Sequence, residues 1–179
     1  MIVSHALRFI FVAVPKTGTH SVRQALRAYM GPDDIEQARL FIEKQFPFPE
    51  LAALKHGHLS FEQVRPFLNE ADFCSYLKFA FVRNPFDRFI SYCSFVTSQQ
   101  GSFDRDPKAV MRHFLLVQPP HNHIIFRPQH TFLTGPDGTL QTDMLCKVET
   151  MQSSFDAVAD RLGIATTPLN HVNRSRRGD

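Results

Sequence analysis

The chain has 179 residues, of which 43% are hydrophobic and 21% charged, and its formal net charge at pH 7 is +3. This length and composition predict one globular domain over residues 1–179 and exclude disordered and collagen-like chains. The charge excess is too small to predict a nucleic-acid or membrane surface. Any site for an anion must therefore come from a few basic residues placed close together.

The apolar and cysteine patterns indicate the compartment. The longest apolar run near the N-terminus, Phe9 to Val14, has six residues, whereas a membrane span needs about 20. No basic and apolar signal segment comes before it. Cys74, Cys93 and Cys146 belong to no recognisable pair or motif. We therefore expect a soluble protein in a reducing, cytoplasmic setting, with no membrane span.

Two continuous apolar runs, Arg8–Val14 and Leu77–Val82, predict strands that are buried on both faces. Such runs are typical of a parallel sheet covered by helices. Each run is followed by residues at helical spacing, Val22 to Tyr29 after the first and Phe86, Phe89, Ile90 and Cys93 after the second. Asn84 and Pro85 stand where the N-cap and the first residue of the second helix are expected. The alternation predicts an α/β fold with a P-loop-like central parallel sheet flanked by helices.

The remaining elements are shorter. We expect a helix at Ile35–Gln45, a capped helix from Ser60 to Leu68, a helix at Pro107–Val117, a strand at Asp143–Val148 and a helix from Phe155 to a C-cap at Gly163. Residues 119–142 are rich in proline and histidine and predict loops with short strands.

The strongest chemical feature is the turn Pro15-Lys-Thr-Gly-Thr-His-Ser21 between the first strand and its helix. Backbone N–H groups at a helix start, together with the positive end of the helix dipole, attract an anion. Gly18 allows a tight turn and a close approach of the backbone to phosphate. Lys16 can reach over the anion, and hydroxyl donors are available from Thr17, Thr19 and Ser21. The Walker sequence is absent, and the alternative is an ordinary turn with Lys16 in solvent.

A second basic residue, Arg83, stands at the carboxyl end of the second strand. Ligands of open α/β sheets bind at that edge. An NTPase would place an aspartate there to help hold Mg²⁺, whereas an arginine binds a phosphate directly. Ser91, about two turns into the following helix, can add a hydroxyl. The alternative is a local salt bridge between Arg83 and Asp87.

Taken together, these segments resemble the PAPS-dependent sulfotransferases, specifically their carbohydrate-type branch. Residues 11–21 are similar to the 5′-phosphosulfate loop of that family, and residues 81–91 are similar to its 3′-phosphate motif. Further similar segments follow in the family's order at Arg127–Gln129, Val148–Glu149 and His171–Ser175. The matching segments span nearly the whole chain, and the two main motifs are specific as a pair.

The resemblance implies the sulfotransferase fold and an enzyme that uses 3′-phosphoadenosine 5′-phosphosulfate (PAPS) as donor, without a metal ion. It implies a sugar or glycan hydroxyl as acceptor and a soluble, bacterial member of the branch. Lys16 would stabilise the leaving group. The residues implied to bind the donor are Lys16, Thr17, Gly18, Thr19, His20 and Ser21 at the 5′ end, Arg83 and Ser91 at the 3′-phosphate, and Arg174 in a closing basic segment.

A catalytic base is implied by His56-Gly-His58, which resembles the His-Gly-His segment of the uronyl 2-O-sulfotransferases. An imidazole changes its protonation near neutral pH, as a general base requires. We expect His58 to be the base, with His56 in reserve, and Glu149 and His20 as weaker candidates. The alternative is that both loop histidines are merely polar surface residues.

Two other functions stay open. A P-loop kinase-like phosphotransferase would need ATP and Mg²⁺, against which Arg83 and the missing Walker sequence argue. A catalytically inactive nucleotide-binding protein is the other possibility, because the chain ends at Asp179 where relatives usually continue with a further helix. His121, His123 and His130 match no zinc-ligand spacing, so we expect no metal site.

Overall fold

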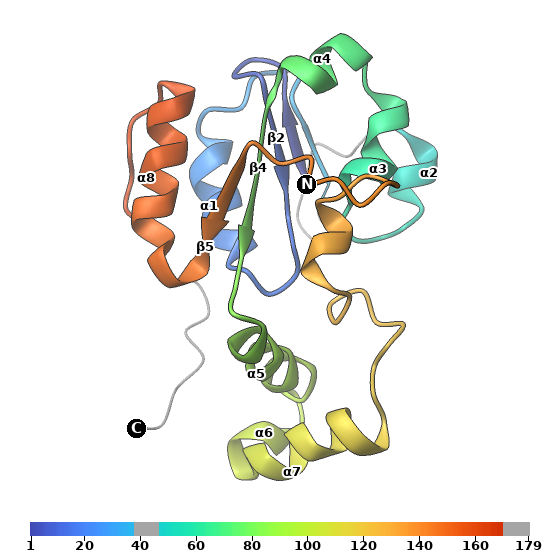
Figure 1. The fold of residues 1–179 in the computed structure, drawn as a ribbon. Helices are drawn as coiled ribbons and strands as arrows, with labels where there is room; N and C mark the ends of the chain where they lie inside the picture. Colours follow the sequence, from blue (N-terminus) through green and yellow to red (C-terminus); the bar gives the residue numbers. More distant parts are fainter. Residues whose placement is uncertain (38–46, 170–179) are drawn as a thin grey trace.

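The computed structural model describes residues 1–37 and 47–169. These residues form a five-stranded mixed sheet, in the order β3-β1-β2-β4-β5, with helices packed on both of its faces (Figure 1). The predicted α/β fold is thus confirmed. The strands are β1 (Ile2–Ser4), β2 (Phe9–Val12), β3 (Ile35–Glu36), β4 (Leu77–Val82) and β5 (Met144–Lys147).

The sheet is parallel only in part. β4 pairs in parallel with both β2 and β5, whereas β1 is antiparallel to β2 and to β3. The prediction missed β1, because three residues carry no strand pattern of their own. It was wrong at Ile35 and Glu36, which form β3 and not the start of a helix, since they extend the sheet beside β1. Positions 38–45 of that predicted helix lie outside the described residues.

Several helix ends follow the predicted capping. Ser60 and Gln63 form the capping box of α3, Asn84 accepts from the Phe86 N–H at the start of α5, and Gly163 ends α8 at a φ of 67°. The predicted helix at Pro107–Val117 is α7 followed by a π-helical turn. The helices are α1 (Thr19–Arg27), α2 (Pro49–Ala52), α3 (Phe61–Val64), α4 (Glu70–Ser75), α5 (Pro85–Val96), α6 (Ser102–Arg105), α7 (Pro107–Arg112) and α8 (Met151–Leu162), with 3₁₀ turns at Arg65–Phe67, Gln129–Phe132 and Val148–Thr150 and the π turn at His113–Val117.

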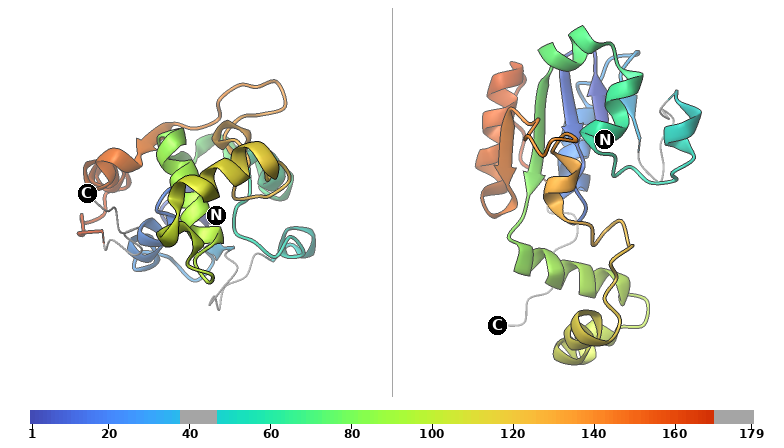
Figure 2. Two further views of the ribbon diagram at one scale, coloured as in Figure 1. Left: turned by 90° about the horizontal axis from the view of Figure 1, so that it is seen from below. Right: turned by 45° about the vertical axis from the view of Figure 1, so that its right-hand side comes forward.

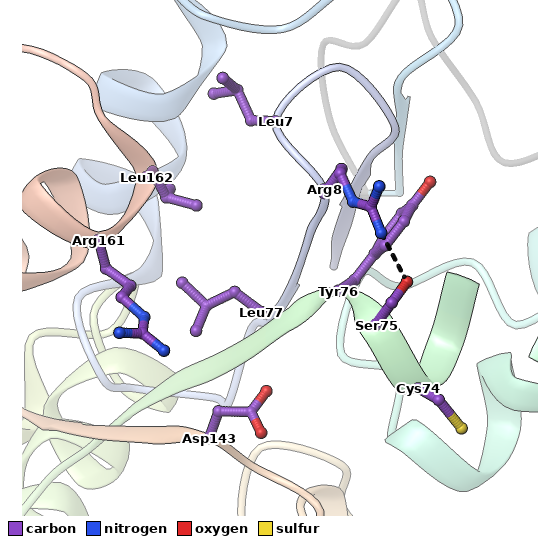
Figure 3. A pocket seen from close by; sticks show the side chains of 9 residues that line it. All are labelled: Leu7, Arg8, Cys74, Ser75, Tyr76, Leu77, Asp143, Arg161 and Leu162. Atoms are coloured by element: carbon purple, nitrogen blue, oxygen red, sulfur yellow. Dashed lines mark hydrogen bonds between the residues drawn. The ribbon is translucent and has the colours of Figure 1, made fainter. Parts of the chain in front are cut away.

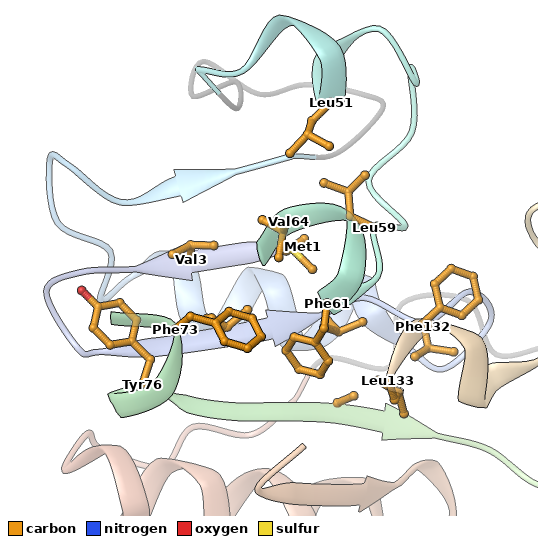
Figure 4. Packing of buried hydrophobic residues seen from close by; sticks show 14 residues of the cluster. Met1, Val3, Leu51, Leu59, Phe61, Val64, Phe73, Tyr76, Phe132 and Leu133 are labelled. Atoms are coloured by element: carbon orange, nitrogen blue, oxygen red, sulfur yellow. The ribbon is translucent and has the colours of Figure 1, made fainter. Parts of the chain in front are cut away.

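Side chains of the central strands pack into two separate hydrophobic cores, one on each face of the sheet. Ile10 and Val12 of β2 face the core under α2 and α3, together with Phe61 and Phe73 (Figure 4). The neighbouring residues Phe9 and Phe11 face the opposite core, which α1 and α8 cover. Burial on both faces explains why the strands are continuously apolar.

Helices α5, α6 and α7 lie beyond the carboxyl ends of the parallel strands and not on a face of the sheet, as Figures 1 and 2 show. The apolar face predicted for α5 is therefore buried only in part, at Cys93. Phe86 is 79% exposed and Ile90 38% exposed, while Arg88, Tyr92 and Cys93 are buried. The reason is that α5 packs through Tyr92 against the 123–126 segment, where the rings of Tyr92 and Phe126 are 5.3 Å apart. In the described part of the chain, no helix has the length and apolarity to span a membrane.

Phe79 provides a test of the core. Its ring lies between those of Phe9 and Phe11, with centroid distances of 5.6 and 5.2 Å, and it is fully buried. We expect Phe79→Ala to lower the free energy of unfolding by about 3–5 kcal/mol through lost burial and a residual cavity. Urea denaturation measures the change. The matched control is Phe86→Ala on the exposed side of α5, which should change stability by about 0.5 kcal/mol or less. Equal effects of the two substitutions would contradict the assignment of Phe79 to the core and of Phe86 to the surface.

Candidate functional site

The loop that follows β2 turns sharply into α1. Lys16 has a φ of 63° and Gly18 a φ of 70°, both in the left-handed region. That region is easy for glycine but strained for lysine. The Thr17 hydroxyl donates to the Val14 carbonyl over 2.9 Å, which closes the turn. In this arrangement Thr17 can offer a bound anion its backbone N–H, while its hydroxyl proton is engaged within the loop.

The loop brings Lys16 close to Arg83 from the end of β4. Burial and, second, the positive charge of Arg83 lower the pKa of Lys16 to about 8. The Lys16 ammonium lies 4.1 Å from the centre of the Phe95 ring on α5. Two cations held together in a half-buried place repel each other unless an anion lies between them. The residues predicted for two anion sites on separate strands therefore meet at one edge of the sheet.

Two side chains from distant segments hold the backbone at the end of β4. The Gln129 amide accepts from the Arg83 N–H at 2.9 Å and donates to the Arg83 carbonyl at 2.8 Å. Glu149 accepts from the Asn84 N–H at 2.6 Å, and this bond holds the pKa of its carboxyl below the usual value. The segments Arg127–Gln129 and Val148–Glu149, which the resemblance singled out, thus both end at the Arg83 turn.

Arg88 is a residue that sequence reasoning missed. It is 8% exposed on α5, and burial lowers its pKa to about 10. Its guanidinium donates to the Pro15 carbonyl at 3.0 Å and to the carbonyls of Ile125 and Arg127 at 2.8 Å each. The available signal was its position four residues before Tyr92, on the same face of the helix.

His58 lies beside the end of β2. Its Nδ1 is 2.7 Å from the Ala13 carbonyl oxygen. Because a carbonyl can only accept, Nδ1 carries the hydrogen and Nε2 keeps its lone pair. Burial is the main cause that lowers the pKa of His58 to about 3. The imidazole is therefore neutral at physiological pH, which is the form that can accept a proton.

The segment around His58 is held from α1. Arg23, 5% exposed, donates to the Gly57 carbonyl at 3.0 Å and to the Gln37 carbonyl at 2.9 Å. The His56 ring lies 6.3 Å from that of His58, and burial lowers its pKa. Among the described residues, the buried Nδ1 of His56 has no hydrogen-bond partner. Arg23, like Arg88, was not predicted from the sequence.

The other predicted residues have varied positions. Thr19 and Ser21 are buried in the first turn of α1, His20 is exposed there, and Ser91 is half-buried on α5. Arg174 and the His171–Ser175 segment lie outside the described residues. Within the described ranges, no three His, Cys, Asp or Glu side chains are grouped so that they could hold a metal ion.

A cavity of about 340 Å³ lies at the opposite edge of the sheet, where β2, β4 and β5 begin (Figure 3). Arg8 and Arg161 line it from opposite sides, with Leu77 between them. The Arg8 guanidinium donates to the Ser75 hydroxyl at 3.0 Å. Among the described residues, none of those predicted for donor binding or catalysis lines this cavity. The candidate site is therefore the carboxyl edge of the sheet, around Lys16, Arg83 and His58.

Comparison with known proteins identifies one family. The family model described as "Sulfotransferase family" matches residues 1–178. No curated protein and no solved structure gives a significant match.

The strained backbone at Lys16 leads to a prediction about stability. Lys16→Met removes the ammonium and keeps the left-handed φ of a side-chain-bearing residue, whereas Lys16→Gly also removes the strain. We expect Lys16→Gly to unfold with a free energy about 0.5–1 kcal/mol higher than Lys16→Met, the strain released less the entropy cost of glycine. Chemical denaturation measures this difference. Lys55, with a φ of 54° on an exposed loop, is the control: Lys55→Gly should gain as much over Lys55→Met. A Lys16→Gly variant no more stable than Lys16→Met would contradict the expectation.

Proposed function

Because the chain belongs to the sulfotransferase family, we propose that it transfers the sulfuryl group of PAPS to a carbohydrate hydroxyl. The observation that carries the proposal is the meeting of Lys16 and Arg83 at one sheet edge, close enough for the charge of Arg83 to lower the pKa of Lys16. PAPS carries a phosphosulfate at its 5′ end and a phosphate at its 3′ position. A donor with two anionic ends matches two cations from neighbouring strands.

The donor fits the chemistry of these residues. The turn with Lys16 and Gly18 in left-handed conformations leads into the first turn of α1, whose backbone N–H groups suit the 5′-phosphosulfate. Arg83 would bind the 3′-phosphate, with the half-buried Ser91 adding a hydroxyl. Thr19, His20 and Ser21 complete the 5′ subsite in this proposal, and Arg174 would approach from the C-terminal segment. A sulfuryl group carries less charge than a phosphoryl group, so no metal ion is proposed.

In the proposed reaction, the acceptor oxygen forms a bond to sulfur while the bond from sulfur to the bridging oxygen breaks. The electron pair stays on the 5′-phosphate of the product 3′,5′-ADP. Lys16 stabilises that developing charge. The acceptor proton goes to Nε2 of His58, whose tautomer the Ala13 carbonyl fixes. His56 is the reserve candidate, while Glu149 is engaged with the Asn84 N–H.

The carbohydrate acceptor rests on the resemblance of residues 56–58 to the uronyl 2-O-sulfotransferases. Phe95, 51% exposed beside the Lys16 ammonium, adds an aromatic surface of the kind that packs against the apolar face of a sugar. A cytoplasmic location is proposed from the cysteines. Cys74, Cys93 and Cys146 are free thiols in the structure, as a reducing compartment allows.

Nucleotide binding tests the donor assignment. We expect 3′,5′-ADP to raise the melting temperature more than 5′-AMP or ATP with Mg²⁺, because only 3′,5′-ADP fills both anion subsites. Affinity measured by calorimetry should fall about tenfold per pH unit above pH 8, since the free Lys16, with a pKa of about 8, loses the proton that binding requires.

The control for the pH dependence is Lys16→Arg, which stays charged and should bind 3′,5′-ADP with nearly constant affinity from pH 7 to about pH 10. A wild-type affinity that is flat over this range would contradict the role of Lys16. Selective stabilisation by ATP with Mg²⁺ would favour the phosphotransferase alternative instead.

His58→Ala tests the base. We expect the rate of sulfate transfer from PAPS to fall by about 10²–10⁴-fold, because the acceptor hydroxyl loses its proton acceptor. The affinity for 3′,5′-ADP should remain unchanged, since His58 binds no part of the nucleotide in this proposal. A labelled-PAPS assay measures the rate, and calorimetry the affinity.

The control for His58 is His130→Ala, an exposed histidine in the 3₁₀ turn at Gln129–Phe132, which should leave both quantities unchanged. Parallel loss of rate and nucleotide affinity in His58→Ala would indicate a structural role. Full activity of His58→Ala together with an inactive His56→Ala would move the role of base to His56.

A further inference from the structure

We infer that Arg88 and Gln129 are positioning residues that set the separation between the two anion subsites at Lys16 and Arg83. This inference rests on the proposed function, because it concerns how one donor with two anionic ends is recognised. Neither side chain needs to touch the donor. Each acts on the backbone that carries a binding residue.

Burial of the Arg88 guanidinium costs free energy, which other interactions in the structure must offset. A buried guanidinium loses its hydration, and neutral partners return less free energy than a carboxylate would. Among the described residues, no carboxylate lies within salt-bridge distance of Arg88. Its guanidinium donates to backbone carbonyls of two separate segments. One is Pro15 in the loop between β2 and α1, called the donor loop below, and the other is Ile125 with Arg127 in the loop after η2 (His113–Val117). The side chain thus ties these two loops to α5.

Gln129 continues this connection to the second subsite. It follows Arg127 by two residues, and its amide holds both the N–H and the carbonyl of Arg83. A paired donor and acceptor fixes the orientation of a peptide as a ladder of sheet hydrogen bonds does. Consequently the direction in which the Arg83 side chain leaves the backbone depends on Gln129.

The two contacts form one path between the subsites. It runs from Lys16 through the Pro15 carbonyl to Arg88, from Arg88 to the Arg127 carbonyl, and through Gln129 to Arg83. A second route exists, because α5 itself begins at Pro85, two residues after Arg83. Together, α5 and the loop that Arg88 and Gln129 hold fix the distance between Lys16 and Arg83. A bisphosphate of matching length should then gain affinity over either of its halves, as two linked ligands do.

The experiment compares 3′,5′-ADP with 5′-AMP and 3′-AMP by calorimetry. In the wild type, we expect 3′,5′-ADP to bind at least about tenfold more tightly than either monophosphate. Arg88→Lys keeps the charge but cannot bond three carbonyls in a fixed fork. In this variant we expect each monophosphate to bind within about threefold of the wild type, while the advantage of the bisphosphate falls to about threefold or less.

Gln129→Leu isolates the 3′ subsite. Losing both hydrogen bonds should weaken 3′-AMP about tenfold and leave 5′-AMP unchanged. The matched controls are Arg105→Lys and Gln118→Leu. Arg105 is an exposed arginine that donates to the Gln100 carbonyl, and Gln118 is an exposed glutamine. Neither control should alter any of the three affinities.

The outcomes separate the inference from the proposed function. No binding of 3′,5′-ADP by the wild type would overturn the donor assignment, and this inference with it. Wild-type binding with an unchanged bisphosphate advantage in Arg88→Lys would overturn the inference alone. A parallel loss of all three affinities would show a merely structural role and overturn it as well. If circular dichroism shows that Arg88→Lys does not fold, Gln129→Leu decides, and an unchanged affinity for 3′-AMP overturns the inference.

Discussion

Holding two cations at one edge of the sheet is the constraint around which the candidate site is built. Lys16 and Arg83 come from the ends of neighbouring parallel strands, and the charge of Arg83 already lowers the pKa of Lys16. Repulsion would separate such groups on flexible loops. Here the strands are buried on both faces, and the strained φ of Lys16 persists because the surrounding structure holds the backbone in place. An anion between the cations would remove most of the cost.

Two buried arginines extend this rigid frame in opposite directions. Arg88 joins the donor loop to the segment that clamps Arg83, and Arg23 joins α1 to the carbonyl of Gly57 between the two candidate histidines. Arg23 also lies 3.6 Å from Glu36, which is 2% exposed and itself bonded to Arg27. The helix that begins at the donor loop therefore also positions the candidate base. The donor side and the acceptor side of the proposed site are thus parts of one framework.

Short sequence patterns predicted those parts of this framework whose conformation depends on residues adjacent in the chain. The apolar runs of β2 and β4, the cap at Asn84 and the turn around Gly18 all have a sequence pattern with a direct physical cause. The sulfotransferase family also emerged from the two loop motifs. The parts that sequence reasoning missed depend on distant partners. β1 is a strand because it pairs with β2, and β3 is a strand because it pairs with β1.

The partly exposed apolar face of α5 has the same origin. Periodicity placed Phe86 on one helix face with Cys93, but it does not show which part of the helix packs against the rest of the fold. α5 instead continues past the strand ends, where the groups to be covered are loop carbonyls. A buried arginine satisfies such carbonyls better than phenylalanine does. In α5, therefore, a polar side chain is buried and an apolar one is exposed at the end of the sheet where the candidate site lies.

Burial gives Lys16 and His58 low pKa values by the same physical cause, although their proposed tasks are opposite. Before the donor binds, the lysine is close to losing its proton and the histidine holds none. If the donor binds as proposed, the negative charge of its phosphosulfate would favour protonation of both groups. It would keep Lys16 cationic for the leaving oxygen and make Nε2 of His58 a stronger proton acceptor. In the proposed mechanism, donor binding therefore prepares the acid side and the base side of the site together, so that an acceptor hydroxyl meets an effective base only when a sulfuryl group is present to receive it.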